Sequence, residues 1–87
     1  MPVTVKTGAA LKQHTGGRRQ VQAEGATVGE LLDHLGLRAV VCDDAGQVHR
    51  YYNIHVNHGK EIRLLQGLDT PVHDGDTVVI LTAIAGG

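Results

Sequence analysis

Aromatic side chains are scarce in this chain of 87 residues, which has no Trp, no Phe and only two Tyr. A core built from it has to be aliphatic, and a chain of this length supports one domain but not two. Cysteine is scarce as well, and the lone Cys42 excludes an internal disulfide. A single thiol fits a reducing compartment, so we expect a cytoplasmic protein.

Long apolar runs are missing. No stretch approaches the roughly 20 residues of a membrane-spanning helix, and the N-terminus lacks the charged-then-apolar pattern of a secretory signal. Strong charge of one sign is also missing, because the formal net charge is −1 with both signs mixed. These features predict neither a nucleic-acid partner nor a membrane partner.

Residues that could carry chemistry do not form a convincing set. Among six histidines, His55 and His58 are the nearest pair across a strand end, but no Cys or carboxylate beside them completes a metal site. Cys42 is followed by Asp43 and Asp44, whose negative charges oppose thiolate formation. We therefore expect no metal and no catalytic residue.

Residues 16–19 (Gly-Gly-Arg-Arg) look like half of a phosphate-binding loop. The Lys-Ser/Thr pair and the strand-loop-helix context that such a loop requires do not follow. The segment therefore does not predict nucleotide binding.

One helix is clearly signalled. Thr27 and Glu30 have the spacing of a capping box, and Gly36 can end the helix in the left-handed conformation. Val28 and the leucines at 31, 32 and 35 fall on one face, which predicts a helix that covers one side of a sheet.

Several segments are typical of strands, because β-branched and apolar residues alternate between turn signals such as Asp74-Gly75-Asp76. We predict strands at residues 3–6, 18–23, 51–57, 61–63 and 77–81. Leu64, Leu65 and Leu68 should anchor the loop that leads to the final turn. The predicted core is Val3, Val5, Val21, Val28, Leu31, Leu32, Leu35, Ile54, Val56, Ile62, Val78 and Ile80.

The last five residues, 83–87 (Ala-Ile-Ala-Gly-Gly), come one residue after the predicted final strand. They have almost no side chains, so they could enter a narrow tunnel, where glycine allows the closest backbone approach. Ordering each residue costs about 1–2 kcal/mol of backbone entropy, and only Ile84 offers an anchor. We expect residues 1–87 to form one domain with residues 83–87 as a flexible tail.

Three stretches together carry a family resemblance: residues 14–17 (His-Thr-Gly-Gly), residues 49–57 and the terminal Ala-Ile-Ala-Gly-Gly. With these three stretches in this order, the chain resembles the ubiquitin-like sulfur-carrier family of the ThiS, MoaD and CysO type. The resemblance is strongest to the CysO-type carriers of that family. The resemblance implies an α+β fold, the ubiquitin-like β-grasp, with a mixed sheet of about five strands crossed by one main helix.

The resemblance also implies a function. An ATP-dependent enzyme of the ubiquitin-activating type (ThiF/MoeB-like) would adenylate the carboxylate of Gly87, and a sulfur donor would convert it to a thiocarboxylate. Gly86, Ala85 and Ile84 would be needed for entry into the enzyme's tunnel. A second enzyme would then accept the sulfur in the biosynthesis of cysteine, a cofactor or a secondary metabolite. On this reading the chain is a protein co-substrate rather than an enzyme, and binds no cofactor. ATP and Mg would be used by the activating partner.

Two alternatives remain open. The same activated tail could form isopeptide bonds with lysines, as in a ubiquitin-like modifier. The chain could also be a MoaD-like small subunit of molybdopterin synthase.

The face of the sheet opposite the helix is a candidate docking surface. Tyr51 and His55 alternate onto it from one predicted strand, and Val79 and Leu81 from another. Clustered exposed apolar residues on so small a domain are typical of partner sites.

Overall fold

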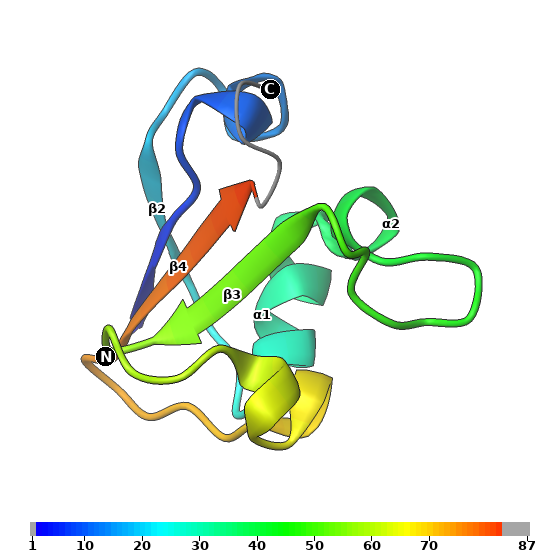
Figure 1. Cartoon of the computed structure of the whole chain (residues 1–87). Coiled ribbons are helices and arrows are strands. Elements are labelled where there is room, and N and C mark those ends of the chain that lie inside the picture. Colours follow the sequence, from blue (N-terminus) through cyan, green and yellow to red (C-terminus); the bar gives the residue numbers. More distant parts are fainter. Residues whose placement is uncertain (1, 83–87) are drawn as a thin grey trace.

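The computed structural model describes residues 2–82, and these form a mixed four-stranded sheet with helices packed against one face (Figure 1). The strand order is β2-β1-β4-β3. The strand β1 pairs antiparallel with β2 and parallel with β4, and β4 pairs antiparallel with β3. The strands are β1 (Val3–Lys6), β2 (Gln20–Ala23), β3 (Tyr52–Val56) and β4 (Thr77–Thr82).

The main helix, α1 (Val28–Leu35), has the predicted caps. The Thr27 hydroxyl accepts a hydrogen bond from the backbone N–H of Glu30 (3.2 Å), and the Glu30 carboxylate accepts one from the N–H of Ala26 (3.0 Å). At the other end Gly36 is left-handed (φ 70°), and the N–H of Leu37 donates to the carbonyl of Leu32 at 2.9 Å. Such bonds satisfy backbone groups that a helix end leaves unpaired.

Four short helical segments were not predicted. They are η1 (Ala9–His14), α2 (Arg38–Val41), η2 (Ile62–Leu64) and η3 (Gly67–Asp69). Helical segments of three to six residues are too short to show an apolar period in the sequence, and their conformation depends on tertiary contacts.

The predicted strand at residues 61–63 is wrong, so the described sheet has four strands rather than about five. Glu61 makes one isolated bridge with His55, after which η2 begins. The Glu61 side chain accepts a hydrogen bond from the N–H of Arg63 (3.3 Å), which favours the turn over an extended chain. Ile62 is still buried, because a turn can present one apolar side chain to the core as well as a strand can.

The core between the sheet and α1 is aliphatic and contains most of the predicted residues. Val21, Leu35 and Val56 are only partly buried, and Leu64 and Leu65 are exposed (73% and 46%), so the prediction that these two leucines anchor the loop was wrong. The buried residues that the prediction missed are Leu11, Ala23, Leu37, Val41, Cys42 and Val72.

No helix within residues 2–82 has the length and apolar character needed to cross a membrane.

Candidate functional site

The predicted reactive segment lies outside the described residues. Gly87, Gly86, Ala85 and Ile84 were assigned to activation and tunnel entry, and these roles remain predictions, as does the flexibility of residues 83–87. The structure does describe the strand from which this segment starts.

That strand, β4, is central in the sheet, between β1 and β3. Its last residue, Thr82, pairs with Tyr52 of β3, and Val79 pairs with Lys6 of β1. A strand with a hydrogen-bonded neighbour on each side is held more firmly than an edge strand. This two-sided pairing covers Val78 and Val79 of β4, and Thr82 itself is held by β3.

The sheet face turned away from α1 contains a shallow groove beside β4. We call it the outer groove; it has a volume of about 340 Å³ and is lined by Lys6, His55, His58, Val79 and Leu81. His55 and Val79 are directly paired across β3 and β4, and Leu81 is 48% exposed. The structure thus brings together three of the four predicted docking residues, and their role in docking remains a prediction.

Tyr51 is not part of the outer groove. Its ring stacks on His49 (centroids 5.9 Å apart, planes at 27°), and the guanidinium carbon of Arg50 lies 5.5 Å from the ring centre. The Tyr51 side chain is 42% exposed, so it remains accessible at the start of β3, but apart from the other three residues.

Of the two histidines predicted as the nearest candidate pair, His55 lies in β3 and His58 in the turn that follows it. His55 Nδ1 donates a hydrogen bond to the Gly59 carbonyl (2.9 Å), while Asn57 and His58 are left-handed (φ 52° and 61°). His55 therefore helps to close the turn. Within the described part of the chain, no group of three or more His, Cys, Asp or Glu side chains is arranged to hold a metal ion.

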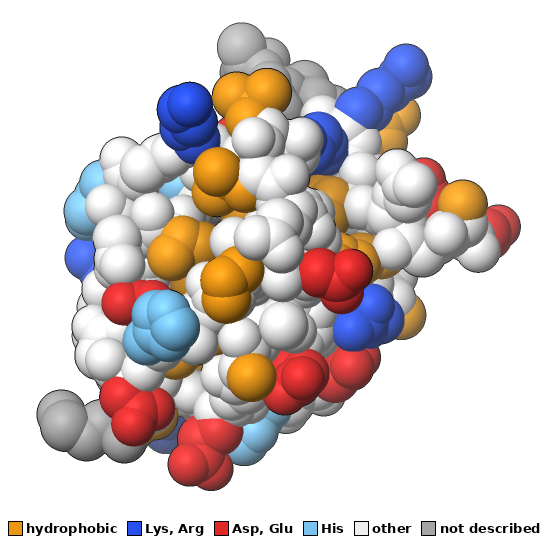
Figure 2. Space-filling view, turned by 90° about the horizontal axis from the view of Figure 1, so that it is seen from below, with side chains coloured by type: hydrophobic (Ala, Val, Ile, Leu, Met, Phe, Trp, Pro, Cys, Tyr) orange, Lys and Arg blue, Asp and Glu red, His pale blue; other side chains and the backbone are white. Residues whose placement is uncertain are grey.

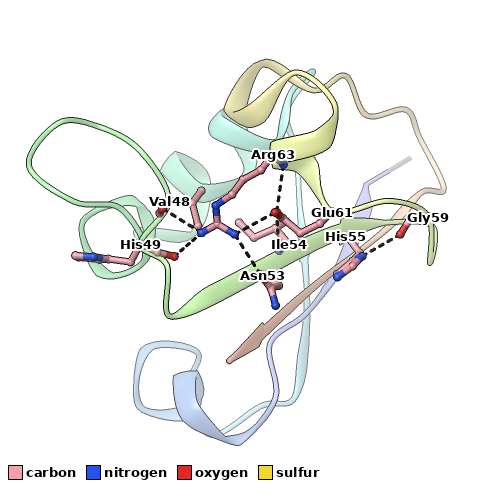
Figure 3. Close-up of polar contacts among 8 residues, drawn as sticks. All are labelled: Val48, His49, Asn53, Ile54, His55, Gly59, Glu61 and Arg63. Atoms are coloured by element: carbon pink, nitrogen blue, oxygen red, sulfur yellow. Dashed lines mark hydrogen bonds and ion pairs between the residues drawn. The ribbon is translucent and has the colours of Figure 1, made fainter. Parts of the chain in front are cut away.

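Arg63, which no pattern in the sequence indicated, joins η2 to the segment before β3 (Figure 3). Its guanidinium donates to the carbonyls of Val48 (3.1 Å) and His49 (2.6 Å), to the side chain of Asn53 (3.2 Å) and to Glu61 (3.0 Å). A planar guanidinium with five N–H donors suits such a set of acceptors. Arg63 thereby fixes the chain that enters β3 next to the end of β4.

Cys42 is buried (7% exposed), and burial, as the main cause, raises the pKa of its thiol. Arg38 lowers this pKa in part, and Asp43 and Asp33 raise it further. Neighbouring charge, the cause expected from Asp43 and Asp44, is therefore the smaller effect on this thiol, and desolvation is the larger one. A buried, protonated thiol is a weak nucleophile.

Comparison with known proteins gives matches along the whole chain. The model of the ThiS family matches residues 5–87. The sulfur carrier protein CysO of Mycobacterium tuberculosis (strain ATCC 25618 / H37Rv) is 40% identical over 94 aligned positions that cover 100% of both chains.

Solved structures agree with this match. A chain in the crystal structure of the Amycolatopsis orientalis BexX/CysO complex is 41% identical, with a TM-score of 0.87 over 98% of this chain and 99% of that one. SAMP1 from Haloferax volcanii is 26% identical, with a TM-score of 0.74 over 100% of both chains. The similarity to CysO is the stronger of the two, and both matches place this chain among ubiquitin-like β-grasp structures.

Proposed function

Because the chain belongs to the ThiS family, we propose that it is a sulfur carrier protein whose Gly87 carboxylate is converted to a thiocarboxylate. The observation that carries the proposal is the end-to-end match to a sulfur carrier at 40% identity, together with the diglycine at the end of the chain.

Activation is needed because a carboxylate is a poor electrophile. An oxygen of the Gly87 carboxylate attacks the α-phosphorus of ATP, pyrophosphate leaves, and an acyl-adenylate forms. Hydrosulfide then attacks the acyl carbon, and the C–O bond to AMP breaks, so that AMP leaves. The product is a C-terminal thiocarboxylate, which is a better nucleophile than the carboxylate at neutral pH.

The partners supply the catalytic groups in this proposal. An adenylyltransferase of the ThiF/MoeB-like, ubiquitin-activating type provides the ATP and Mg site, so the chain itself holds no cofactor. A biosynthetic enzyme then receives the sulfur for cysteine, a cofactor or a secondary metabolite. The chain's part is to present its C-terminal residues beyond Thr82, the residue of β4 that pairs with Tyr52 of β3.

Two other functions use the same activated terminus. The similarity to SAMP1, a small archaeal modifier protein, favours a protein modifier at lower identity. A MoaD-like subunit of molybdopterin synthase would keep the terminus inserted in a stable partner complex.

One experiment separates these possibilities. The protein is incubated with the activating enzyme, ATP, Mg and sulfide, and its intact mass is measured. We expect a gain equal to the exchange of one oxygen for sulfur, and no gain in a variant that lacks Gly87. A ladder of lysine-linked adducts without the thiocarboxylate would contradict sulfur carriage in favour of a modifier. A stoichiometric complex that survives gel filtration would favour the subunit role.

A further inference from the structure

Charge is distributed unevenly along this nearly neutral chain. The first 23 residues contain Lys6, Lys12, Arg18 and Arg19 but no Asp or Glu, whereas residues 64–87 contain three Asp and no Lys or Arg. The net charge of the whole sequence is close to zero because a basic segment and an acidic segment offset each other.

The fold places the basic segment at the end of the sheet where β4 finishes. Lys6, the last residue of β1, pairs with Gln20 at the start of β2 and with Val79 in β4. The carbonyl of Arg19 accepts a hydrogen bond from the N–H of Thr7 (2.9 Å), which fixes this arginine beside the end of β1.

Arg50 lies at the same end of the sheet, on the other side of β4. It precedes β3, whose first residue, Tyr52, pairs with Thr82. The loop of residues 43–47, which contains two carboxylates, projects away from the sheet (the green loop in Figure 1). We call Lys6, Lys12, Arg18, Arg19 and Arg50 the basic collar.

The turn that carries the collar's arginines is well defined. Thr15 is buried (8% exposed), and its hydroxyl lies 2.7 Å from the Arg18 carbonyl and 3.2 Å from that of Lys12. The N–H of Gly17 donates to the Lys12 carbonyl at 2.8 Å, with Gly16 and Gly17 both left-handed (φ 67° and 84°). The Thr-Gly-Gly stretch noted in the sequence thus builds a turn that presents two neighbouring, exposed arginines.

The collar's charges are not neutralised within the described chain. The ion pairs there involve Arg38 with Asp33 and Arg63 with Glu61, and none includes a collar residue. Carboxylates gather instead at the opposite end of the sheet, where Glu24 follows β2 and Asp76 precedes β4. Figure 2 looks onto that end and shows acidic side chains spread around it.

We propose that the basic collar docks against a carboxylate-lined rim around the tunnel mouth of the activating enzyme. The proposal rests on the function proposed above, since an enzyme that draws in the residues beyond Thr82 must face the end of the sheet where the collar lies. Opposite charges across such a rim speed up encounter and fix the orientation of the carrier, so that its C-terminus meets the tunnel. The acidic opposite end is repelled by the same rim, which disfavours the reversed approach.

Charge-reversal variants of the full-length carrier test the proposal in pyrophosphate exchange with an activating enzyme that adenylates the wild-type chain. We expect Arg18→Glu and Arg19→Glu each to raise the KM for the carrier by about tenfold at about 0.05 M NaCl, with kcat nearly unchanged. The difference from wild type should shrink at about 0.5 M NaCl, because salt screens exposed charges. Arg18→Lys and Arg19→Lys should behave as wild type.

Lys60→Glu is the matched control, because it makes the same charge change in the turn after β3, at the opposite end of the sheet. If Lys60→Glu raised the KM as much as Arg19→Glu does, the effect would come from the net charge of the carrier and not from the position of the charge. This result would overturn the proposal. So would unchanged KM values in both arginine variants, or a loss that persists at high salt. A fall in kcat with unchanged KM would replace the proposal with a direct contact to the nucleotide phosphates.

The wild-type reaction keeps the two proposals distinct. If the wild-type chain supports no exchange with any activating enzyme of this type, the proposed function fails and the collar proposal fails with it. If the wild type is adenylated and the collar variants match it, only the collar proposal fails.

Discussion

The side chains of Asn57 and Asp76 are hydrogen-bonded to each other, with the Asn57 amide N–H donating to Asp76 Oδ1 at 2.9 Å. The Asn57 Oδ1 also accepts from the backbone N–H of Thr77 (2.8 Å), and the backbone N–H of Asn57 donates to the Thr77 carbonyl (2.7 Å). The turn after β3 and the turn before β4 are thereby joined. This contact sets the register of β4, the strand that leads to the C-terminus.

Loss of the Asn57 side chain should destabilise the fold. We expect Asn57→Gly to lower the free energy of unfolding by about 1–2 kcal/mol, because two exposed hydrogen bonds of the side chain are lost. Urea denaturation measures the change. Glycine keeps the left-handed conformation at φ 52° without strain, so it isolates the hydrogen bonds, and Asn57→Ala should be worse by about 1 kcal/mol. Equal stability of Asn57→Gly and wild type would show that the contact contributes nothing.

Stability should also depend on the ionisation of Asp76. Hydrogen bonds from the Asn57 side chain and, second, from the His73 backbone lower the pKa of Asp76 in the folded protein. A lowered folded-state pKa stabilises the fold fully above the unfolded-state pKa of about 4, and the contribution is lost as the pH falls through the folded-state pKa. The difference in unfolding free energy between wild type and Asp76→Asn should therefore be largest above about pH 5 and shrink below about pH 3.

Denaturant titrations at several pH values provide this comparison. In the Asn57→Gly background the pH-dependent part should be smaller, because the main hydrogen bond that lowers the pKa is gone. A difference between wild type and Asp76→Asn that stays constant over the whole range would contradict the assignment.

Arg63 should stabilise the entry to β3 more than the whole domain. We expect Arg63→Ala to speed amide hydrogen exchange at His49 and Tyr52 by roughly five- to tenfold, the equivalent of one net hydrogen bond. The His49 amide donates to the Val41 carbonyl and the Tyr52 amide to the His49 carbonyl, and Arg63 itself holds that His49 carbonyl. Exchange at Ile54 in the middle of β3 should change little. Uniform acceleration across the sheet would instead mean that Arg63 supports global stability.

Leu81 offers a direct test of the outer groove. We expect Leu81→Glu to weaken binding to the activating enzyme by about tenfold or more without unfolding the domain, because it places a charge in an apolar contact. Leu64→Glu is a suitable control, since Leu64 is an even more exposed leucine outside this groove. Titration calorimetry with both variants measures the effect, and equal affinities for the two would remove the groove from the docking surface.

The C-terminal residues give the sharpest functional prediction. Deleting Gly87, or replacing Gly86 with Val, should abolish pyrophosphate exchange. The deletion removes the residue whose carboxylate is adenylated, and the valine adds a side chain in an enzyme tunnel that we expect to accept backbone alone. Thermal unfolding should be unchanged, since β4 ends at Thr82. Undiminished exchange by the truncated chain would overturn the role of Gly87.

The sequence alone determined the elements that rest on local signals. The helix α1 has its capping Thr27 and its stop at Gly36 within one short stretch, so neighbouring residues decide where it begins and ends. The alternation around Ile54 and Ile80 likewise assigned β3, β4 and their buried faces, because a strand places every second side chain on the same side. The terminal diglycine and the family resemblance were also visible without a structure.

Tertiary structure decided what depends on partners distant in the chain. The parallel pairing of β1 with β4 places residues 6 and 79 side by side, and no local pattern encodes that choice. Residues 61–63 became a turn instead of a strand, and Leu11 and Val72 joined the core, because burial there is set by elements that arrive from elsewhere in the sequence. Tertiary structure likewise decided the contacts of Arg63 and the position of the basic collar around the end of β4. A long side chain or an exposed charge acquires its role only when folding brings its partners or its neighbours together.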